Sequence, residues 1–461
     1  MNGEFGVCVD GVNPSKMKKY GDIIRVIKKS KRSKKQKEVY FTCYDDKIIS
    51  NQFPNRVLPS LIEDLLNISL ATFAADRAVQ RDSYVPAKLS YNEGRFFSRK
   101  IHLTVPVSNK EKWDSLKLKL EKAISFMTYD VFTYSFIPLN KINNEIKGGS
   151  SEYDSIALFS GGLDSFAGSY FLSKQNKPLF VSINHGNIGG LLSNTYLVSP
   201  IKKNKLIIEI KSPRKGKGFK ESTQFSRSLV YLSMAVSLAI ANSIKKIFIP
   251  ENGVIANQIG LNSEKFGTRT VNPIFLNYFT KLINDLFNDN FEILNPFNYL
   301  TKGEVVKIIE DKNTIKKTVS CAHYSRFKDT EYCGMCMPCI LRIISTVSNG
   351  IQNDKEISKY GINPFLINLD KPEIKENMSN WNKLTENVYR DGILNVLELI
   401  KFAYEIQNDS QKDLLTKHYE FYDEKLFKMY IRFSIEIIKT LNYFSERNPS
   451  LKKRIPEIKR E

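Results

Sequence analysis

One short stretch in the middle of the chain limits what this region can fold into. The apolar run 156–159 predicts a buried strand, and residues 166–173 predict a helix directly after it. A loop between a strand and a helix directs backbone N–H groups and the positive end of the helix dipole outward. Glycines at 161 and 162 let the backbone approach phosphate oxygens without an intervening Cβ. The loop 160–165 therefore predicts an anion site.

The spacing of this loop separates it from the commoner nucleotide fingerprints. Walker A needs Lys-Ser/Thr after its second glycine, and the dinucleotide fingerprint needs Gly-x-Gly-x-x-Gly; the loop has neither. It resembles instead the pyrophosphate loop (PP-loop) of ATP pyrophosphatases, through the motif Ser160-Gly161-Gly162-Leu163-Asp164-Ser165. That superfamily splits ATP between the α- and β-phosphates and adenylates a substrate oxygen. The structural alternative is a glycine-rich turn without a ligand.

Four of the six cysteines crowd between residues 321 and 339. Cys333, Cys336 and Cys339 give two successive Cys-x-x-Cys spacings, and Cys321 lies twelve positions before the first of them. Four thiolates suit tetrahedral zinc and leave no open position for catalysis. We expect a structural Zn²⁺ site here; unligated thiols, an iron–sulfur cluster, and His323 in place of one cysteine are the alternatives.

Length and charge bound the remaining possibilities. A chain of 461 residues predicts two or three domains. The net charge of +20 favours an anionic partner such as a nucleotide, a nucleic acid or an acidic protein surface, or else a solvated basic surface. The N-terminus lacks a signal-peptide pattern, and the longest apolar run, 229–241, is too short to span a bilayer. Together with clustered cysteines, this predicts a cytoplasmic protein.

We expect three regions. Residues 1–148 are interpreted as an N-terminal α/β domain that recognises a partner or gates the site, with 140–154 as a polar linker. Its expected elements are strands at 7–9, 23–27, 39–43 and 101–107, and helices at 61–73 and 113–127. Residues 349–461 are expected to be helical, with a long amphipathic helix at 426–444 and a frayed tail from 452 onward.

Residues 149–348 alternate strands with helices, which predicts a doubly wound parallel sheet. Ligands of such sheets lie at the carboxyl ends of the strands. The segments that should gather there are 160–165, 184–187, 250–253 and 295–302. Residues 254–272 are expected to form a polar loop, and Thr301 with Glu304 predicts a capping box for the helix that starts at Lys302.

The PP-loop followed by the cysteine segment resembles the 7-cyano-7-deazaguanine synthase family (QueC) over about 155–348. The resemblance rests on four segments, 158–165, 225–233, 295–304 and 333–342. The biosynthetic enzymes are about half this length, lack both flanking regions, and have a shorter gap than that between Cys321 and Cys333. The added length and the segments 250–253 and 267–273 look more like the large QueC-like proteins of bacterial anti-phage cassettes (QatC type).

The resemblance implies a nucleotide site and the residues that form it. The fold would be that of the adenine nucleotide α-hydrolases, with ATP, Mg²⁺ and Zn²⁺ as cofactors. The expected nucleotide-binding residues are Ser160, Gly161, Gly162, Leu163, Asp164 and Ser165. The expected catalytic residues are Asp164, which stabilises the loop or binds Mg²⁺, and Lys302 and Arg227, which neutralise phosphate charge unless they are surface cations. Arg269 is a further candidate cation, and His185 a candidate for the adenine pocket or a structural histidine.

The resemblance also implies an activity. The expected reaction adenylates the carboxylate of 7-carboxy-7-deazaguanine, and an amine then displaces AMP to give an amide or nitrile. In the anti-phage type the amine would be the N-terminus of a partner protein. The alternatives are 7-cyano-7-deazaguanine synthesis with ammonia, a PP-loop enzyme that modifies tRNA, and a non-enzymatic nucleotide sensor.

Overall fold

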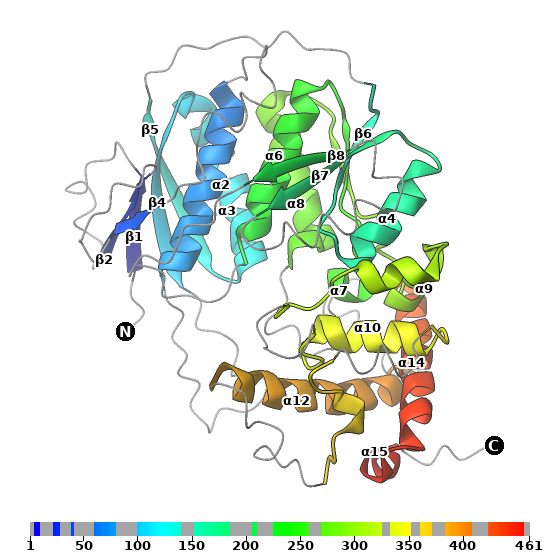
Figure 1. Ribbon diagram of the computed structural model, residues 1–461. Coiled ribbons are helices and arrows are strands. Elements are labelled where there is room, and N and C mark those ends of the chain that lie inside the picture. Colours follow the sequence, from blue (N-terminus) through cyan, green and yellow to red (C-terminus); the bar gives the residue numbers. More distant parts are fainter. Residues whose placement is uncertain are drawn as a thin grey trace.

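Two parallel sheets and a group of C-terminal helices make up the molecule (Figure 1). The computed structural model describes residues 4–9, 22–27, 38–40, 60–79, 99–139, 152–184, 205–209, 225–257, 269–324, 332–351, 360–370, 383–407 and 423–455. Residues 140–151 of the expected linker at 140–154, and the candidate His185, lie outside these residues.

The first sheet has five parallel strands in the order β3-β2-β1-β4-β5. They are β1 (Glu4–Val9), β2 (Asp22–Ile27), β3 (Glu38–Tyr40), β4 (Lys100–Val107) and β5 (Val131–Pro138). Helices α2 (Ser60–Ala78) and α3 (Lys110–Thr128) pack on it. The expected elements are found except that β5 was not predicted, although Phe132, Tyr134 and Phe136 alternate and are buried. β3 begins at Glu38, and residues 41–43 lie outside the described chain.

The second sheet also has five parallel strands, in the order β10-β9-β6-β7-β8. They are β6 (Ser155–Leu158), β7 (Pro178–Asn184), β8 (Lys205–Glu209), β9 (Lys246–Phe248) and β10 (Glu292–Leu294). Its helices are α4 (Leu163–Ser173), α6 (Arg227–Ala241), α7 (Gly253–Asn257), α8 (Pro273–Phe287) and α9 (Lys302–Ile308). The expected parallel α/β sheet is confirmed.

Both sheets follow the same winding. Counted from its own first strand, each has the order 3-2-1-4-5. Helices α2 and α6 both follow the third strand of their sheet, and α3 and α8 both follow the fourth. In the layer between the sheets α2 packs on α6 and α3 packs on α8, so that corresponding helices are partners (Figure 1). One hydrophobic core runs through this layer and both sheets.

This shared core bears on the domain boundaries. The expected boundary at 148 falls between the two sheets, but their helices bury one another's apolar faces. The hydroxyls of Ser69 on α2 and Ser233 on α6 lie 2.6 Å apart inside the layer. The division of the chain at 148 and at 348 stays a prediction.

The C-terminal helices form a second packing unit around the cysteine segment. They are α10 (Met337–Val347), α12 (Lys383–Glu405), α14 (Glu424–Ser445) and α15 (Pro449–Arg454), with short 3₁₀ helices η5 (Lys312–Lys317) and η6 (Pro364–Leu366). The expected helical region and its long helix are confirmed. The frayed tail was wrong at its start, because residues 452–454 belong to α15, which Asn448 caps.

The expected polar loop at 254–272 was also wrong in part. Residues 253–257 form α7, capped by the Asn252 side chain, which accepts from the Ile255 N–H at 3.1 Å. A 3₁₀ helix, η4 (Arg269–Val271), precedes α8, and residues 258–268 lie outside the described chain. The described helices include none that is long and apolar enough to cross a membrane.

Candidate active site

The loop between β6 and α4 is held in shape by its own serines. The Ser165 hydroxyl accepts from the Ser160 N–H at 3.3 Å, and the Ser160 hydroxyl accepts from the Gly162 N–H at 3.2 Å. Gly161 has φ 77°, a left-handed conformation that favours glycine. Gly162 is the N-cap of α4, and no side chain caps that helix. The amides that begin α4 therefore suit a bound anion.

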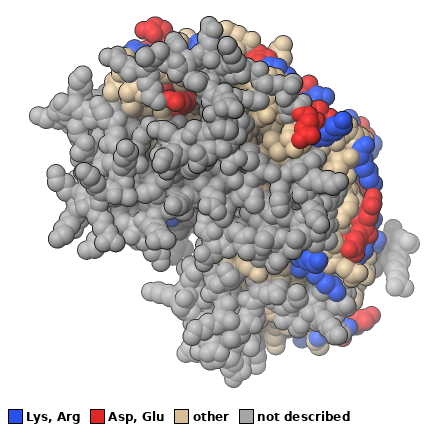
Figure 2. All heavy atoms as spheres, turned by 45° about the horizontal axis from the view of Figure 1, so that its top comes forward, with Lys and Arg blue, Asp and Glu red and all other residues tan. Residues whose placement is uncertain are grey.

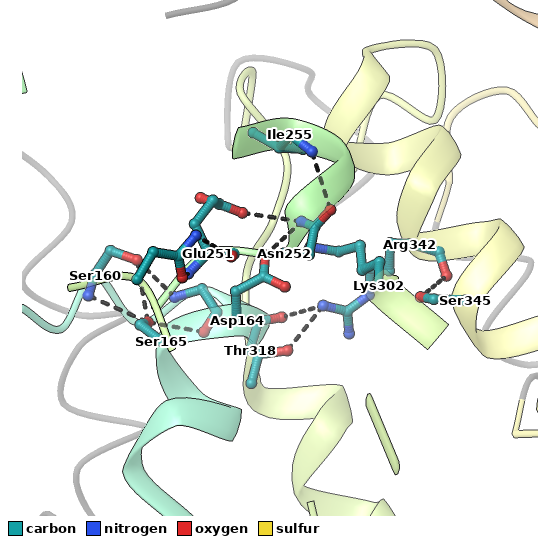
Figure 3. Close-up of polar contacts among 12 residues, drawn as sticks. Ser160, Asp164, Ser165, Glu251, Asn252, Ile255, Lys302, Thr318, Arg342 and Ser345 are labelled. Carbon is teal, nitrogen blue, oxygen red and sulfur yellow. Dashed lines mark hydrogen bonds and ion pairs between the residues drawn. The ribbon is translucent and has the colours of Figure 1, made fainter. Parts of the chain in front are cut away.

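A buried ion pair lies beside this loop (Figure 3). Lys302 Nζ donates to Asp164 Oδ2, and the two residues are 2% and 8% exposed. The second carboxylate oxygen, Asp164 Oδ1, is buried and has no hydrogen-bond partner within the described chain. Lys302 is the first residue of α9, whose start is fixed by the expected capping box of Thr301 and Glu304. The structure thus brings together two residues that lie 138 positions apart in the sequence.

Glu251 and Asn252 complete this polar cluster from the carboxyl end of β9. Asn252 Nδ2 lies 3.0 Å from Glu251 Oε1 and 3.4 Å from Asp164 Oδ2 (Figure 3). The Glu251 N–H donates to Asn295 Oδ1 at 3.1 Å. The predicted gathering of 160–165, 250–253 and 295–302 is confirmed, and 185–187 lie outside the described chain. The cluster lies where β6 and β9 adjoin, which is the switch point of the winding.

The charge of this cluster is unbalanced. Glu251 and Asp164 are neighbouring carboxylates with one ammonium group, that of Lys302, between them. Burial first, and then the Asp164 charge, raise the pKa of Glu251 well above its ordinary value. Such a pair is stabilised by a proton or by a cation. Glu251 was not predicted as a site residue, because the two carboxylates become neighbours only in the folded chain. Its place directly after a strand end was the available signal.

The cysteine segment supports the loop through a chain of hydrogen bonds. The Arg342 guanidinium, on α10, donates to the Thr318 carbonyl at 3.0 Å and the Ile315 carbonyl at 2.7 Å. Val319, which follows Thr318 in the sequence, donates its N–H to the Gly161 carbonyl at 3.2 Å. Arg342 is the last residue of the segment 333–342, on which the resemblance to QueC rests in part, and it had no predicted role. Its contacts make it a structural residue that holds the segment beside the glycines.

The four cysteines converge as a metal site requires. The sulfurs of Cys321, Cys333, Cys336 and Cys339 all lie within 4.8 Å of one another. Tetrahedral zinc–thiolate bonds place sulfurs about 3.8 Å apart, and Cys333 Sγ and Cys339 Sγ are 3.9 Å apart. Hydrogen bonds from the other three thiols lower the pKa of Cys321, which favours the thiolate that a metal needs.

The backbone around the cysteines fits this role. The N–H groups of His323 and Cys333 each donate to Cys321 Sγ at 3.3 Å. Gly334 has φ 80°, and a Cβ on it would lie 1.7 Å from the Ile362 carbonyl oxygen. The four cysteine sulfurs and the backbone packed around them suit a structural zinc ion.

The two other predicted cations, Arg227 and Arg269, lie over aromatic rings. Arg227 is the first residue of α6, with its guanidinium 5.8 Å from the centre of the Tyr231 ring. Arg269 stacks on Tyr129 at 3.8 Å and donates to the Phe126 carbonyl at 3.2 Å. Its contacts are with the end of α3 and the residue after it, so packing between the two sheets explains it. The role of Arg227 stays a prediction.

Part of the chain is similar to known proteins. Residues 192–349 match the family described as "Queuosine biosynthesis protein QueC". The 7-cyano-7-deazaguanine synthase of Sulfolobus acidocaldarius is 28% identical over 158 residues, which are 32% of this chain and 30% of that protein. The chain thus covers less than a third of that relative's own length. The expected QueC domain is confirmed over 192–349, which includes Lys302 and the four cysteines and begins after the 160–165 loop.

Proposed function

We propose that this protein is an ATP-dependent ligase that adenylates the carboxylate of a 7-deazaguanine, such as 7-carboxy-7-deazaguanine, and couples it to an amine. The observation that carries the proposal is the Asp164–Lys302 pair at an uncapped helix N-terminus, in a chain whose residues 192–349 match QueC. The name of the curated relative supports the deazaguanine as substrate.

The chemistry needs an activated carboxylate. A carboxylate is a poor electrophile, and transfer of AMP to it creates a mixed anhydride with a good leaving group. The loop 160–165 would hold the pyrophosphate of ATP through the first amides of α4 and the hydroxyls of Ser160 and Ser165. Lys302 would stabilise the negative charge that develops as pyrophosphate leaves. Arg227 would add a second positive charge from the start of α6.

A magnesium ion fits the carboxylates. Asp164 Oδ1 lacks a partner within the described chain, and Glu251 lies next to it. Carboxylate oxygens and phosphate oxygens are the ligands that Mg²⁺ prefers. The ion would balance the charge of the two carboxylates and supply electrostatic stabilisation to the phosphates. The zinc ion at the four cysteines would be structural and would take no part in the reaction.

The acceptor amine is a separate part of the proposal. The large QueC-like proteins of anti-phage cassettes, which the chain resembles, favour the N-terminus of a partner protein. Ammonia, which would lead to free 7-cyano-7-deazaguanine, is the alternative acceptor. Mass spectrometry of proteins encoded beside this one would distinguish them, because a deazaguanine adduct on a protein N-terminus is not formed with ammonia.

The activity is tested directly with purified protein, ATP, Mg²⁺ and 7-carboxy-7-deazaguanine. We expect AMP and pyrophosphate to form only when the acid is present. Glu251→Gln should raise the Mg²⁺ concentration needed for half-maximal activity, because one proposed ligand loses its charge. Release of ADP and phosphate, or no dependence on the acid, would contradict the proposal.

Modification of tRNA is the second candidate, and the net charge of +20 is the observation that favours it. On the described part of the face in Figure 2, however, basic and acidic side chains are interspersed. Within the described chain, ion pairs such as Lys119–Asp285 and Lys245–Asp289 also join side chains of opposite charge. Tight tRNA binding that weakens steeply with salt, and AMP release that depends on tRNA, would favour this candidate.

A further inference from the structure

The long helix α14 contacts the candidate site although it lies outside the segment that matches QueC. Met429, Arg432 and Glu436 are spaced by three and four residues, so they lie on one face of the helix. This face contacts the starts of α9 and α7. Helix α9 begins with Lys302 of the polar cluster, and α7 begins directly after Glu251 and Asn252. Figure 1 shows α14 running beside α9 and α10.

Glu436 contacts both neighbours of Lys302. Its Oε1 accepts from the Thr301 hydroxyl at 2.5 Å, and its Oε2 is buried and has no hydrogen-bond partner within the described chain. A Cβ on Gly303 would lie 2.3 Å from Glu436 Oε1, so the contact requires glycine at this position. Lys302 lies between Thr301 and Gly303 in the sequence, and its ammonium group donates to Asp164.

Arg432 holds the same helix start one turn earlier on α14. Its Nε lies 2.7 Å from Glu304 Oε1, and its Nη2 donates to the Tyr299 carbonyl at 2.9 Å. Glu304 is the residue that completes the capping box with Thr301. The guanidinium therefore fixes the carboxylate on which the first turn of α9 depends.

Met429 makes the corresponding contact at α7. A Cβ on Gly253 would lie 2.4 Å from Met429 Sδ and 2.2 Å from the Asn298 carbonyl oxygen. Gly253 directly follows Glu251 and Asn252. One face of α14 thus touches both segments that deliver charged groups to the cluster.

We propose that α14 is a positioning element of the active site, in which Glu436, supported by Arg432, sets the place of Lys302 relative to the leaving pyrophosphate. The identity of that leaving group rests on the proposed function. The raised pKa of Glu436, about 7, reflects the burial of its carboxylate.

The test compares four variants with the wild type. Glu436→Ala removes the contact, and Glu436→Gln keeps an acceptor for the Thr301 hydroxyl. Gly303→Ala pushes the carboxylate away while leaving it in the chain. Thr440→Val is the matched control, because Thr440 is buried one turn further along α14 and contacts the Ile344 carbonyl of α10 at 3.4 Å rather than α9.

Two readouts separate positioning from stability. We expect Glu436→Ala and Gly303→Ala each to lower kcat at least about tenfold with a much smaller change in the KM for ATP, since Lys302 acts on charge that develops in the transition state. Glu436→Gln should stay within about threefold of the wild type. In the Glu436→Ala background, Gly303→Ala should cause no further loss, because the clash is gone.

The second readout needs no turnover. Acylation of Lys302 by an N-hydroxysuccinimide ester, followed by mass spectrometry, should be slow in the wild type and in Thr440→Val and faster in Glu436→Ala. Equal kcat and equal Lys302 labelling in Glu436→Ala and Thr440→Val would overturn the proposal. If the wild type makes no AMP from the acid, the proposed function fails, and the labelling alone decides the role of Glu436.

Discussion

At the scale of single residues, Asp164 determines the charge balance of the candidate site. It accepts from Lys302 and Asn252 and keeps one buried oxygen without a partner within the described chain. Replacement by alanine would leave Lys302 to pair with Glu251 and would displace it from the loop. It would also remove a proposed ligand of Mg²⁺.

We therefore expect Asp164→Ala to reduce AMP formation at least about 100-fold with the fold retained. Steady-state kinetics and circular dichroism check the two parts. Asp154→Asn is the control, because that exposed aspartate accepts from the Lys177 N–H at 2.9 Å and the Ser155 hydroxyl at 2.7 Å, and neither residue belongs to the polar cluster. Activity of the Asp164 variant close to that of the control would show that the carboxylate has no catalytic role.

The residues in and around this cluster differ in how well they could be predicted from the sequence. Asp164 and Lys302 stand in local motifs, a glycine-rich loop and a capping box, whose geometry is set by near neighbours. Glu251 has no such motif, and only the adjacency of β6 and β9 brings it to Asp164. Glu436 is further removed, since it comes from a helix outside the repeating α/β pattern.

At the scale of elements, the cysteine segment links a metal site to the phosphate loop. Cys336 is the N-cap of α10, the helix whose Arg342 holds residues 315–318 beside the loop. Loss of the metal should therefore loosen α10 and the loop together.

We expect Cys336→Ser to lose bound zinc and to unfold at lower temperature, because metal binding contributes on the order of 10 kcal/mol to such sites. Metal analysis and thermal unfolding measure both effects. Cys8→Ser, in β1 of the first sheet, should retain the metal. A Cys336 variant that is free of zinc and as stable as the wild type would contradict the structural role.

The start of α9 gives a prediction about pH. Burial first, and then the charge of Glu304, raise the pKa of Glu436 from 4.5 to about 7, while the Thr301 hydrogen bond, the nearby Gly303 backbone and Lys307 oppose the rise. Arg432, on the same helix as Glu436, pairs with Glu304. The folded chain thus binds this proton more tightly than the unfolded chain. Its contribution to stability is complete below about pH 4.5 and is lost as the pH rises through 7.

The Glu436→Gln variant has no titratable group at this position, so its free energy of unfolding should fall less than that of the wild type between pH 5 and pH 8. The difference in free energy of unfolding should be on the order of 2 kcal/mol. Urea unfolding at the two pH values measures it. Parallel pH dependence in both proteins would show that Glu436 does not titrate in this range.

Elements with strong local signals were predicted, and those that depend on context were not. The helices expected at 61–73 and 113–127 have apolar side chains at helical spacing, and both are present, at 60–78 and 110–128. Helix α7 has five residues and depends on the Asn252 cap and on contact with Met429, which no local pattern shows. Helix α15 ends in three basic residues, and its packing on α14 outweighs that polarity.

At the scale of the whole molecule, the two sheets share a winding but differ at the switch point. In the second sheet Glu251 and Asn252 follow the fourth strand and face the loop. In the first sheet the fourth strand is followed by Ser108 and Asn109, whose N–H groups donate to the Asp64 carboxylate at 2.8 to 3.3 Å. A buried carboxylate of the chain itself thus satisfies these donors.

The first sheet is joined to the second by a buried charge network. Asp76 of α2 is 0% exposed, and its Oδ1 lies 2.6 Å from Arg99 Nη2. Its Oδ2 accepts from the N–H and the hydroxyl of Ser226 at 3.0 and 2.8 Å. Ser226 is the N-cap of α6, which begins with Arg227. One carboxylate therefore connects the first sheet to a helix start of the second.

We expect Asp76→Ala to lower the free energy of unfolding by about 3–5 kcal/mol, because Arg99 stays buried with half of its pairing removed. Asp285→Ala is the matched control: the Lys119–Asp285 pair also joins the two sheets, but its side chains are 54% and 43% exposed, and its loss should cost under about 1 kcal/mol. Urea unfolding should show one transition for all three proteins, since one core spans both sheets. Separate transitions would mean that residues 1–148 fold on their own; equal losses in the two variants would mean that the buried network does not hold the sheets together.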